Sequence, residues 1–257
     1  DLKNTERVAK KLGEKAKVLI RVNPGIRMSR EETIFASAYP DAKCSVIIND
    51  IDPIVEISNN DRITNWLLPR KIKPEFDNAE RILQEASASE HLELLGIHGH
   101  LGSQVTNIKY FEHFFEVITI FYKIMEEKLG EKFHYLDLGG GYPVQYTLEE
   151  KVPTINQLAK ILAKKISDVN IKPELIIESG RFITATSAIL LSKVQITKEN
   201  PSGGKIAVLD LSIYSDLLDI IAAQWQFDYT LVNDLPLEQN KKIVWEWFNP
   251  SFSKRKR

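Results

Sequence analysis

Two histidines, His98 and His100, stand at the end of an apolar run in the segment GIHGHLGSQ, residues 96–104, and glycine and serine follow at once. On a strand, alternation places Gly96, His98 and His100 on one face, and the glycines leave that face uncrowded. Imidazoles in this arrangement could seat a cofactor, ligate a metal or pack in a core. The pair alone leaves these alternatives open, but no other convincing ligand cluster stands out, so we expect no metal.

A triplet of glycines, Gly139, Gly140 and Gly141, directly follows the apolar run LDL. Glycines after a strand let backbone N–H groups approach an anion closely, as phosphate-binding loops require. The same triplet could serve only as a tight turn. Taken alone, it does not decide between these two interpretations.

The segment ESGR, residues 178–181, places the carboxylate of Glu178 three residues before the guanidinium of Arg181 at the end of another apolar run. An ion pair on the surface is one interpretation. The apolar and turn residues around Glu178 instead predict that its side chain is partly buried, which favours a functional role.

The elements that carry these motifs alternate between strands and helices. Apolar runs bounded by turn residues predict buried strands at residues 17–22, 92–101, 133–141, 174–182 and 205–213. Helical periodicity predicts helices at residues 77–87 with Asp77 as the cap, 107–130 with a stop at Gly130, and from Thr154 as a cap to residue 166. A polar, helix-like segment opens the chain. The alternation indicates an α/β fold with a parallel sheet.

All three motifs fall at the carboxyl ends of consecutive predicted strands, which is the face where barrel active sites assemble. The strand ends recur about every 40 residues, compared with roughly 31 per unit in a 250-residue eightfold barrel. Phosphate sites commonly form between neighbouring loops on this face. The glycine triplet and Arg181, with the Ser103 hydroxyl, would supply such a site, so we expect a phosphorylated small molecule.

An acidic residue beside a phosphorylated ligand needs a cationic partner. The protonated ring nitrogen of pyridoxal 5'-phosphate provides one, since pairing with an acid keeps the ring charged as an electron sink. At about 4 Å and an effective dielectric near 20, this interaction is worth roughly 4 kcal/mol. Glu178 is the residue we expect in this role.

Residues 28–74 are an exception to the regular alternation, because they contain one short apolar run, CSVII, among polar segments. We expect this region to be rich in loops. The interval from Arg21 to His98 is about twice the later ones, so it contains either a further strand–helix unit or an insertion.

The overall composition excludes several classes of protein. The 257 residues include 34 Lys plus Arg and 35 Asp plus Glu, so the net charge of -1 gives no reason to expect nucleic acid or an anionic membrane as a partner. One cysteine, Cys44, and the lack of a long apolar stretch or signal-peptide pattern predict a cytoplasmic protein. The chain begins at Asp1 rather than at methionine, so we expect it to be a fragment.

Four segments together resemble a known family. GIHGHLGSQ, YLDLGGGYP, IIESGR and, less specifically, VLIRVNPGI are similar to motifs of the pyridoxal-phosphate-dependent decarboxylases of the alanine-racemase-like barrel fold. Diaminopimelate decarboxylases are the most similar members, and biosynthetic arginine decarboxylases are also similar. The resemblance covers about residues 10–213, in the order that the family has them.

The resemblance implies a role for each motif residue. His100 would stack on the cofactor ring and Glu178 would hold the ring nitrogen, and we expect these two to be catalytic. The remaining cofactor-binding residues would be Arg21 at an earlier strand end, His98 in the pocket wall, and the phosphate-side group Ser103, Gly139, Gly140, Gly141, Gly180 and Arg181.

The resemblance also implies an architecture and an activity. Residues 1–198 would be the C-terminal half of a TIM-type β/α barrel that binds pyridoxal phosphate, and residues 199–257 the divergent start of a C-terminal β domain. The expected reaction is decarboxylation of meso-diaminopimelate to lysine in a homodimer. The alternatives are decarboxylation of arginine or another basic amino acid, and an inactive homologue that binds the cofactor or a partner.

Two departures from the family pattern bear on these expectations. Nothing in the sequence resembles the motif that carries the family's Schiff-base lysine, and the sequence after residue 213 differs from the family's. We therefore expect this chain alone to lack turnover. Half a barrel would also leave strand edges exposed, which argues against independent stability.

Overall fold

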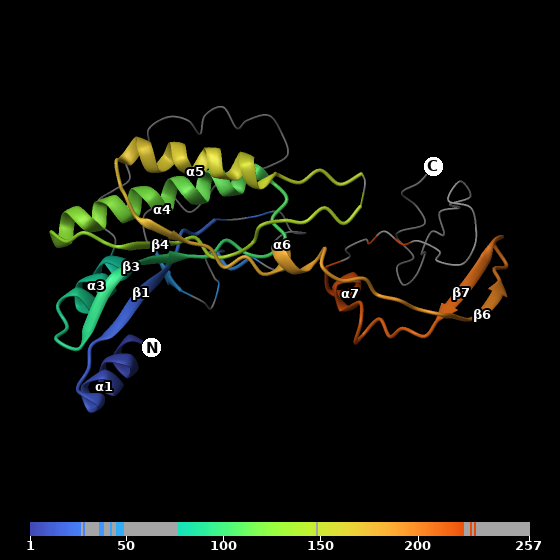
Figure 1. The fold of residues 1–257 in the computed structure, drawn as a ribbon, viewed down its shortest axis with the longest axis horizontal. Coiled ribbons are helices and arrows are strands. Elements are labelled where there is room, and N and C mark those ends of the chain that lie inside the picture. Colours follow the sequence, from blue (N-terminus) through green and yellow to red (C-terminus); the bar gives the residue numbers. More distant parts are fainter. Residues whose placement is uncertain are drawn as a thin grey trace.

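A computed structural model describes residues 1–26, 77–147 and 149–223, together with residues 28, 36–38, 42, 45–48, 227 and 229 (Figure 1). Its helices are α1 (Leu2–Leu12), α3 (Asp77–Ser87), α4 (Ile108–Leu129), α5 (Ile155–Val169), α6 (Arg181–Thr184) and α7 (Leu218–Ala223). Its strands are β1 (Ala16–Asn23), β2 (Val46–Ile47), β3 (Leu92–Gly99), β4 (Tyr135–Asp137), β5 (Glu174–Ile176), β6 (Val194–Glu199) and β7 (Lys205–Leu209).

The first five strands form one parallel sheet in the order β2-β1-β3-β4-β5. Helix α4 connects β3 to β4 and α5 connects β4 to β5, as parallel neighbours require. The predicted α/β fold with a parallel sheet is therefore confirmed. Within the described residues, the sheet is open, with β2 and β5 at its edges.

The strands on either side of the long interval between Arg21 and His98 are neighbours in the sheet. β1 pairs directly with β3, with Arg21 opposite His98, so no strand from the intervening residues lies between them. The choice between a further strand–helix unit and an insertion stays a prediction, because the interval does contribute a strand to the sheet. Its apolar run CSVII contributes β2, which pairs with the other side of β1. Most other residues of 28–74 lie outside the described part of the chain.

The helix boundaries follow the signals in the sequence. In α4 the Asn107 side chain accepts a hydrogen bond from the Lys109 amide, and Gly130 ends the helix with a left-handed φ of 67°. In α5 Thr154 and Gln157 form a reciprocal capping box, which confirms Thr154 as the cap. Asp77 is the first residue of α3 rather than its cap.

The core lies between the sheet and α4, which Figure 1 shows running with α5 along one side of the sheet. Ile97 and Leu101 are fully buried on that side, and a Cβ built on Gly99 would come within 2.9 Å of the Phe114 ring. Aromatic residues dominate the buried face of α4, and include Tyr110, Phe111, Phe114, Phe115, Phe121 and Tyr122. This packing leaves the opposite side of β3, with His98 and His100, to the functional groups.

Gly96 allows β4 to approach β3 closely. A Cβ at this position would collide with the backbone carbonyl of Tyr135 on β4, and the pairing of β1 with β3 is irregular just before it, between Val18 and Leu19. The glycine therefore does more than leave room beside the histidines, because it sets the spacing of two strands that carry the site.

We expect Gly96→Ala to lower the free energy of unfolding by about 2 to 4 kcal/mol, since the clash is with backbone that cannot move without breaking the ladder. Urea unfolding of the two proteins measures this difference. Gly180→Ala is the matched control, because a Cβ there meets nothing within 4 Å and its φ is -84°. Equal losses in both variants would show that strand spacing is not the cause.

Two strands differ from their predicted burial. β5 is exposed along most of its length, because it lies at the sheet edge; Leu175 is 44% exposed, and Ile177, which follows the strand, is 53% exposed. β7 is only half-buried and pairs antiparallel with β6, a strand that the sequence did not predict, in a separate two-stranded sheet (Figure 1). The expected domain boundary at 198/199 falls within β6; the domain division itself remains a prediction.

None of the helices in the described part of the chain is long and apolar enough to cross a membrane.

Candidate cofactor site at the strand ends

Three neighbouring strands bring their ionisable residues into one row across the sheet. Arg21 of β1 lies opposite His98 of β3, which lies opposite Asp137 of β4. Residues opposite each other in parallel strands share a face, so all three side chains are on the same side of the sheet. Immediately beyond this row, the strands give way to the loops that hold His100, the glycine triplet and Glu178.

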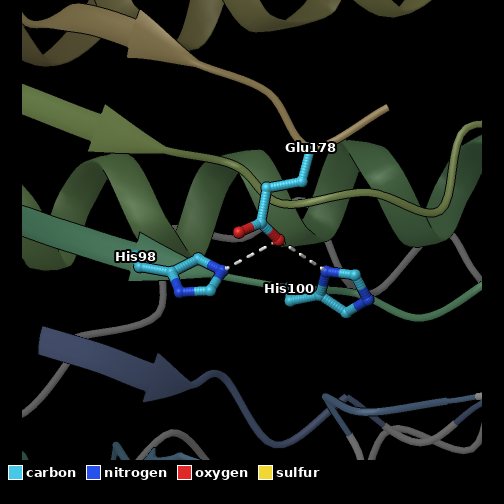
Figure 2. Close-up of side chains that lie close together, drawn as sticks. All are labelled: His98, His100 and Glu178. Atoms are coloured by element: carbon cyan, nitrogen blue, oxygen red, sulfur yellow. Dashed lines mark ion pairs between the residues drawn. The ribbon is translucent and has the colours of Figure 1, made fainter. Parts of the chain in front are cut away.

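Glu178 lies between the two histidines. Its Oε2 atom is 3.5 Å from Nε2 of His98 and 3.5 Å from Nδ1 of His100, and Figure 2 shows the carboxylate from the β5 loop pointing to both rings. The histidine side chains are 16% and 25% exposed, whereas that of Glu178 is 48% exposed. The predicted meeting of these residues is observed. Glu178 was expected to be partly buried, and about half of its side chain is exposed, because it follows the edge strand β5.

Burial disfavours protonation of the two imidazoles. Burial, followed by the positive charge of Arg21, lowers the pKa of His100 below its usual 6.5. Burial also lowers the pKa of His98, although the carboxylates of Asp137 and Glu178 oppose this effect. Removing these rings from water disfavours the imidazolium more than the neighbouring acids favour it.

The lowered pKa values predict a loss of stability on acidification. The unfolded histidines take up protons as the pH falls through about 6.5, while the folded ones do so only at lower pH, so the free energy of unfolding decreases across that window. We expect a lower urea midpoint at about pH 5.5 than at about pH 7.5. The double variant His98→Gln/His100→Asn should reduce this difference; an unchanged difference would contradict the assignment.

Loops that follow β3 and β4 are joined by several hydrogen bonds. The Gln104 side chain donates to the Val144 carbonyl over 2.6 Å and accepts from the Val144 amide over 3.0 Å, and it is buried. The Val105 amide donates to the Gly141 carbonyl, and the Gly140 amide donates to Nδ1 of His100. These contacts fix the glycine triplet against the histidine loop.

The glycine triplet has little space for side chains. A Cβ on Gly139, which has a left-handed φ of 62°, would lie 2.5 Å from Nδ1 of His100, and one on Gly140 would lie 2.8 Å from the Glu178 carbonyl. Glycine is therefore required at both positions for the loops to approach each other.

Arg181 joins the β3 loop to a more distant part of the chain. Its Nε donates to the Ser103 hydroxyl over 3.3 Å, and its Nη1 donates to the Tyr146 hydroxyl over 2.9 Å. Asp219 of α7 also pairs with Nη1 at 3.4 Å. The predicted proximity of Arg181 and Ser103 is thus observed. In the described part of the chain, Arg181 pairs with the carboxylate of Asp219, and Glu178 pairs with the two histidines.

Several residues around the site were not identified from the sequence. Asp137 is buried and its carboxylate accepts from the Gly139 amide over 2.9 Å; an aspartate two residues before a glycine was the available signal for this turn. Burial and the Asp137 charge raise the pKa of Tyr142 to about 12. Gln104 is the last residue of the segment GIHGHLGSQ, so its position in that motif was the available signal. Tyr146 and Asp219 had no local signal, because only the tertiary fold brings them to Arg181.

The donors present fit a phosphorylated pyridine. Within the described part of the chain, two residues of this row have a buried nitrogen without a hydrogen-bond partner, namely Nε of Arg21 and Nε2 of His98. The Ser103 hydroxyl and the Arg181 guanidinium are the kinds of groups that bind phosphate. The glycine triplet lies on the neighbouring loop, where the Gly139 and Gly140 amides already donate to Asp137 and His100. A carboxylate beside them suits a protonated ring nitrogen.

A metal ion is a weaker fit for the same residues. His98, His100 and Glu178 offer three ligand atoms within 4.8 Å of one another. However, the Nδ1 lone pair of His100 already accepts from the Gly140 amide, so this atom is not available as a ligand without breaking that bond.

Comparisons with known proteins agree with the geometry. Residues 71–185 match the family described as pyridoxal-dependent decarboxylase, pyridoxal binding domain. The diaminopimelate decarboxylase of Aquifex aeolicus is 28% identical over 243 residues, which are 95% of this chain and 49% of that protein. The diaminopimelate decarboxylase of Methanocaldococcus jannaschii is 29% identical over 199 residues, covering 75% and 38%.

The fold comparison extends over most of the chain. The crystal structure of the M. jannaschii diaminopimelate decarboxylase in complex with L-lysine superposes with a TM-score of 0.66 and 25% identity, over 86% of this chain and 45% of that one. This chain therefore spans about half or less of the length of the relatives it matches. Sequence and fold together show that the chain is similar to the pyridoxal-dependent decarboxylases in their pyridoxal-binding domain, and to diaminopimelate decarboxylases over part of their length.

Proposed function

We propose that this chain is the cofactor-binding part of a pyridoxal-phosphate-dependent carboxy-lyase that converts meso-diaminopimelate to lysine. The observation that carries the proposal is the meeting of Glu178, His98 and His100 beside a loop pair that joins Ser103 to Arg181. The names of the relatives, and the lysine bound to one of them, support the choice of substrate.

In this proposal the phosphate lies against the loops and the ring lies against Glu178. Ser103, Arg181, Gly180 and the glycine triplet bind the phosphate, while Arg21 faces the row with His98 and contributes positive charge. His100 supports one side of the ring and Glu178 holds the ring nitrogen. When bound, the cofactor withdraws electrons from the α-carbon of an amino acid, so that the α-carboxylate leaves as carbon dioxide.

Two further parts of the proposal concern the assembly. We infer that residues 1–198 act as part of a β/α barrel, with residues 199–257 beginning a second domain, and that the functional protein is a homodimer. Exposed apolar side chains on β5, α6 and the segment leading to β6, among them Ile183 and Leu191, support additional contacts beyond the described residues.

The test is an assay of the product of the complete open reading frame, because this chain alone is not expected to turn over. That protein, loaded with pyridoxal phosphate (the cofactor-loaded protein), is given meso-diaminopimelate, arginine or other basic amino acids as the substrate, and lysine and carbon dioxide are measured. We expect lysine to form from meso-diaminopimelate. Carbon dioxide from arginine would instead support the arginine decarboxylase alternative. Cofactor binding without any turnover would support an inactive homologue, and reduction with borohydride followed by peptide mapping would show whether a lysine holds the cofactor.

A further inference from the structure

We propose that His98 is the residue that positions Glu178, whereas His100 accepts a hydrogen bond from the glycine loop through the nitrogen that faces Glu178. The two histidines are equally far from the carboxylate, yet their hydrogen bonds assign them different tasks. The inference depends on the proposed function only for its catalytic consequence, since the hydrogen bonds themselves belong to the protein without its cofactor.

His100 cannot donate to Glu178 from the nitrogen that faces it. Its Nδ1 accepts a 3.0 Å hydrogen bond from the Gly140 amide, so this atom carries a lone pair and the proton of the neutral ring is on Nε2. The 3.5 Å approach of the Glu178 carboxylate to Nδ1 then brings two acceptors together. This contact does not orient the carboxylate.

His98 has the opposite character. Its Nε2 is buried, has no hydrogen-bond partner in the described part of the chain, and is 3.5 Å from Oε2 of Glu178. An unsatisfied buried donor costs about 1 to 3 kcal/mol, so a small rotation of the carboxylate that completes this bond is favoured. Hydrogen bonds of this kind are often long before the ligand binds and shorten in the complex.

The two residues also differ in how firmly they are held. His98 is part of β3, which is paired on both sides by β1 and β4, and its side chain is 16% exposed. Glu178 follows the edge strand β5 on a loop, and its side chain is 48% exposed. A donor on a strand that is paired on both sides can therefore fix the direction of a carboxylate on a more exposed loop, and His98 is the described residue placed to do so.

A pair of variants separates this role from simple packing. Gln at position 98 can place an amide N–H near the site of Nε2, whereas Leu fills similar space without a donor. We expect His98→Leu to lower kcat of the cofactor-loaded protein by about 10- to 100-fold, as loss of an outer-shell orienting residue does at metal sites, and His98→Gln to recover most of that loss. His134→Leu, at the exposed amino end of β4, is the matched control. Equal kcat losses in the two His98 variants would overturn the proposal.

Nitrogen NMR of the ligand-free protein tests the same inference without the cofactor. We expect Nδ1 of His100 to be unprotonated and Nε2 of His98 to be protonated, and Glu178→Gln to shift the His98 Nε2 resonance more than the His100 Nδ1 resonance. A protonated Nδ1 on His100 would overturn the assignment, and so would a His98 Nε2 resonance whose chemical shift is unchanged in Glu178→Gln. Should the protein not bind pyridoxal phosphate, the proposed function would fail while this measurement would still decide the roles of the histidines.

Discussion

Glu178→Gln is expected to lower kcat of the cofactor-loaded protein by about 100-fold or more. The carboxylate is the acidic group beside the two histidines, and pairing with the ring nitrogen at about 4 Å and a dielectric near 20 is worth up to about 4 kcal/mol. Glutamine keeps the size and one acceptor but removes the charge. Because Glu178 is about half exposed before the cofactor covers it, the measured loss should be smaller than the full electrostatic value.

Steady-state kinetics with meso-diaminopimelate measure this effect, with Glu174→Gln as the matched control. Glu174 is an exposed residue at the amino end of the same strand, so its replacement should leave kcat within about 2-fold of the original protein. If Glu178→Gln and the control gave similar rates, the ring nitrogen would not depend on Glu178.

Arg181→Ala is expected to weaken the binding of pyridoxal phosphate by about 10- to 100-fold. Charge-assisted hydrogen bonds of a guanidinium with a phosphate contribute about 1.5 to 3 kcal/mol, and Arg181 already extends to Ser103 on the neighbouring loop. Arg181→Lys should recover only part of the affinity, since an ammonium group cannot reproduce the planar arrangement of donors.

Pyridoxal, which lacks the phosphate, provides the internal control for this prediction. Fluorescence titration should show that Arg181→Ala changes the Kd for pyridoxal far less than that for pyridoxal phosphate. A similar loss for both ligands would mean that Arg181 acts through the structure of the loops, for example through its contacts with Tyr146 and Asp219, rather than on the phosphate.

The sequence predicted the main groups of the site because parallel strands impose a simple rule. Residues that follow the carboxyl ends of neighbouring parallel strands meet at one edge of the sheet, and His100, Gly140 and Glu178 do so. Their roles toward the cofactor came from the resemblance to a family, and these remain to be tested. Local rules for helix ends also predicted the cap at Thr154 and the stop at Gly130.

The features that the sequence did not predict depend on contacts between distant segments. Periodicity gives the face of a strand but not its neighbours, so the direct pairing of β1 with β3 and the edge position of β5 could not be read in advance. The same limit applies to Arg181, because Asp219 reaches it from α7, 38 residues further along the chain. The different tasks of His98 and His100 depend on which ring nitrogen meets the Gly140 amide, and sequence alone does not contain that information.

A crystal structure of the protein with pyridoxal phosphate bound tests the central claim most directly. We predict that the phosphate contacts Ser103, the glycine triplet and Arg181, and that the ring nitrogen faces the Glu178 carboxylate. A cofactor bound away from these strand ends, or one whose ring nitrogen has no contact with Glu178, would contradict it.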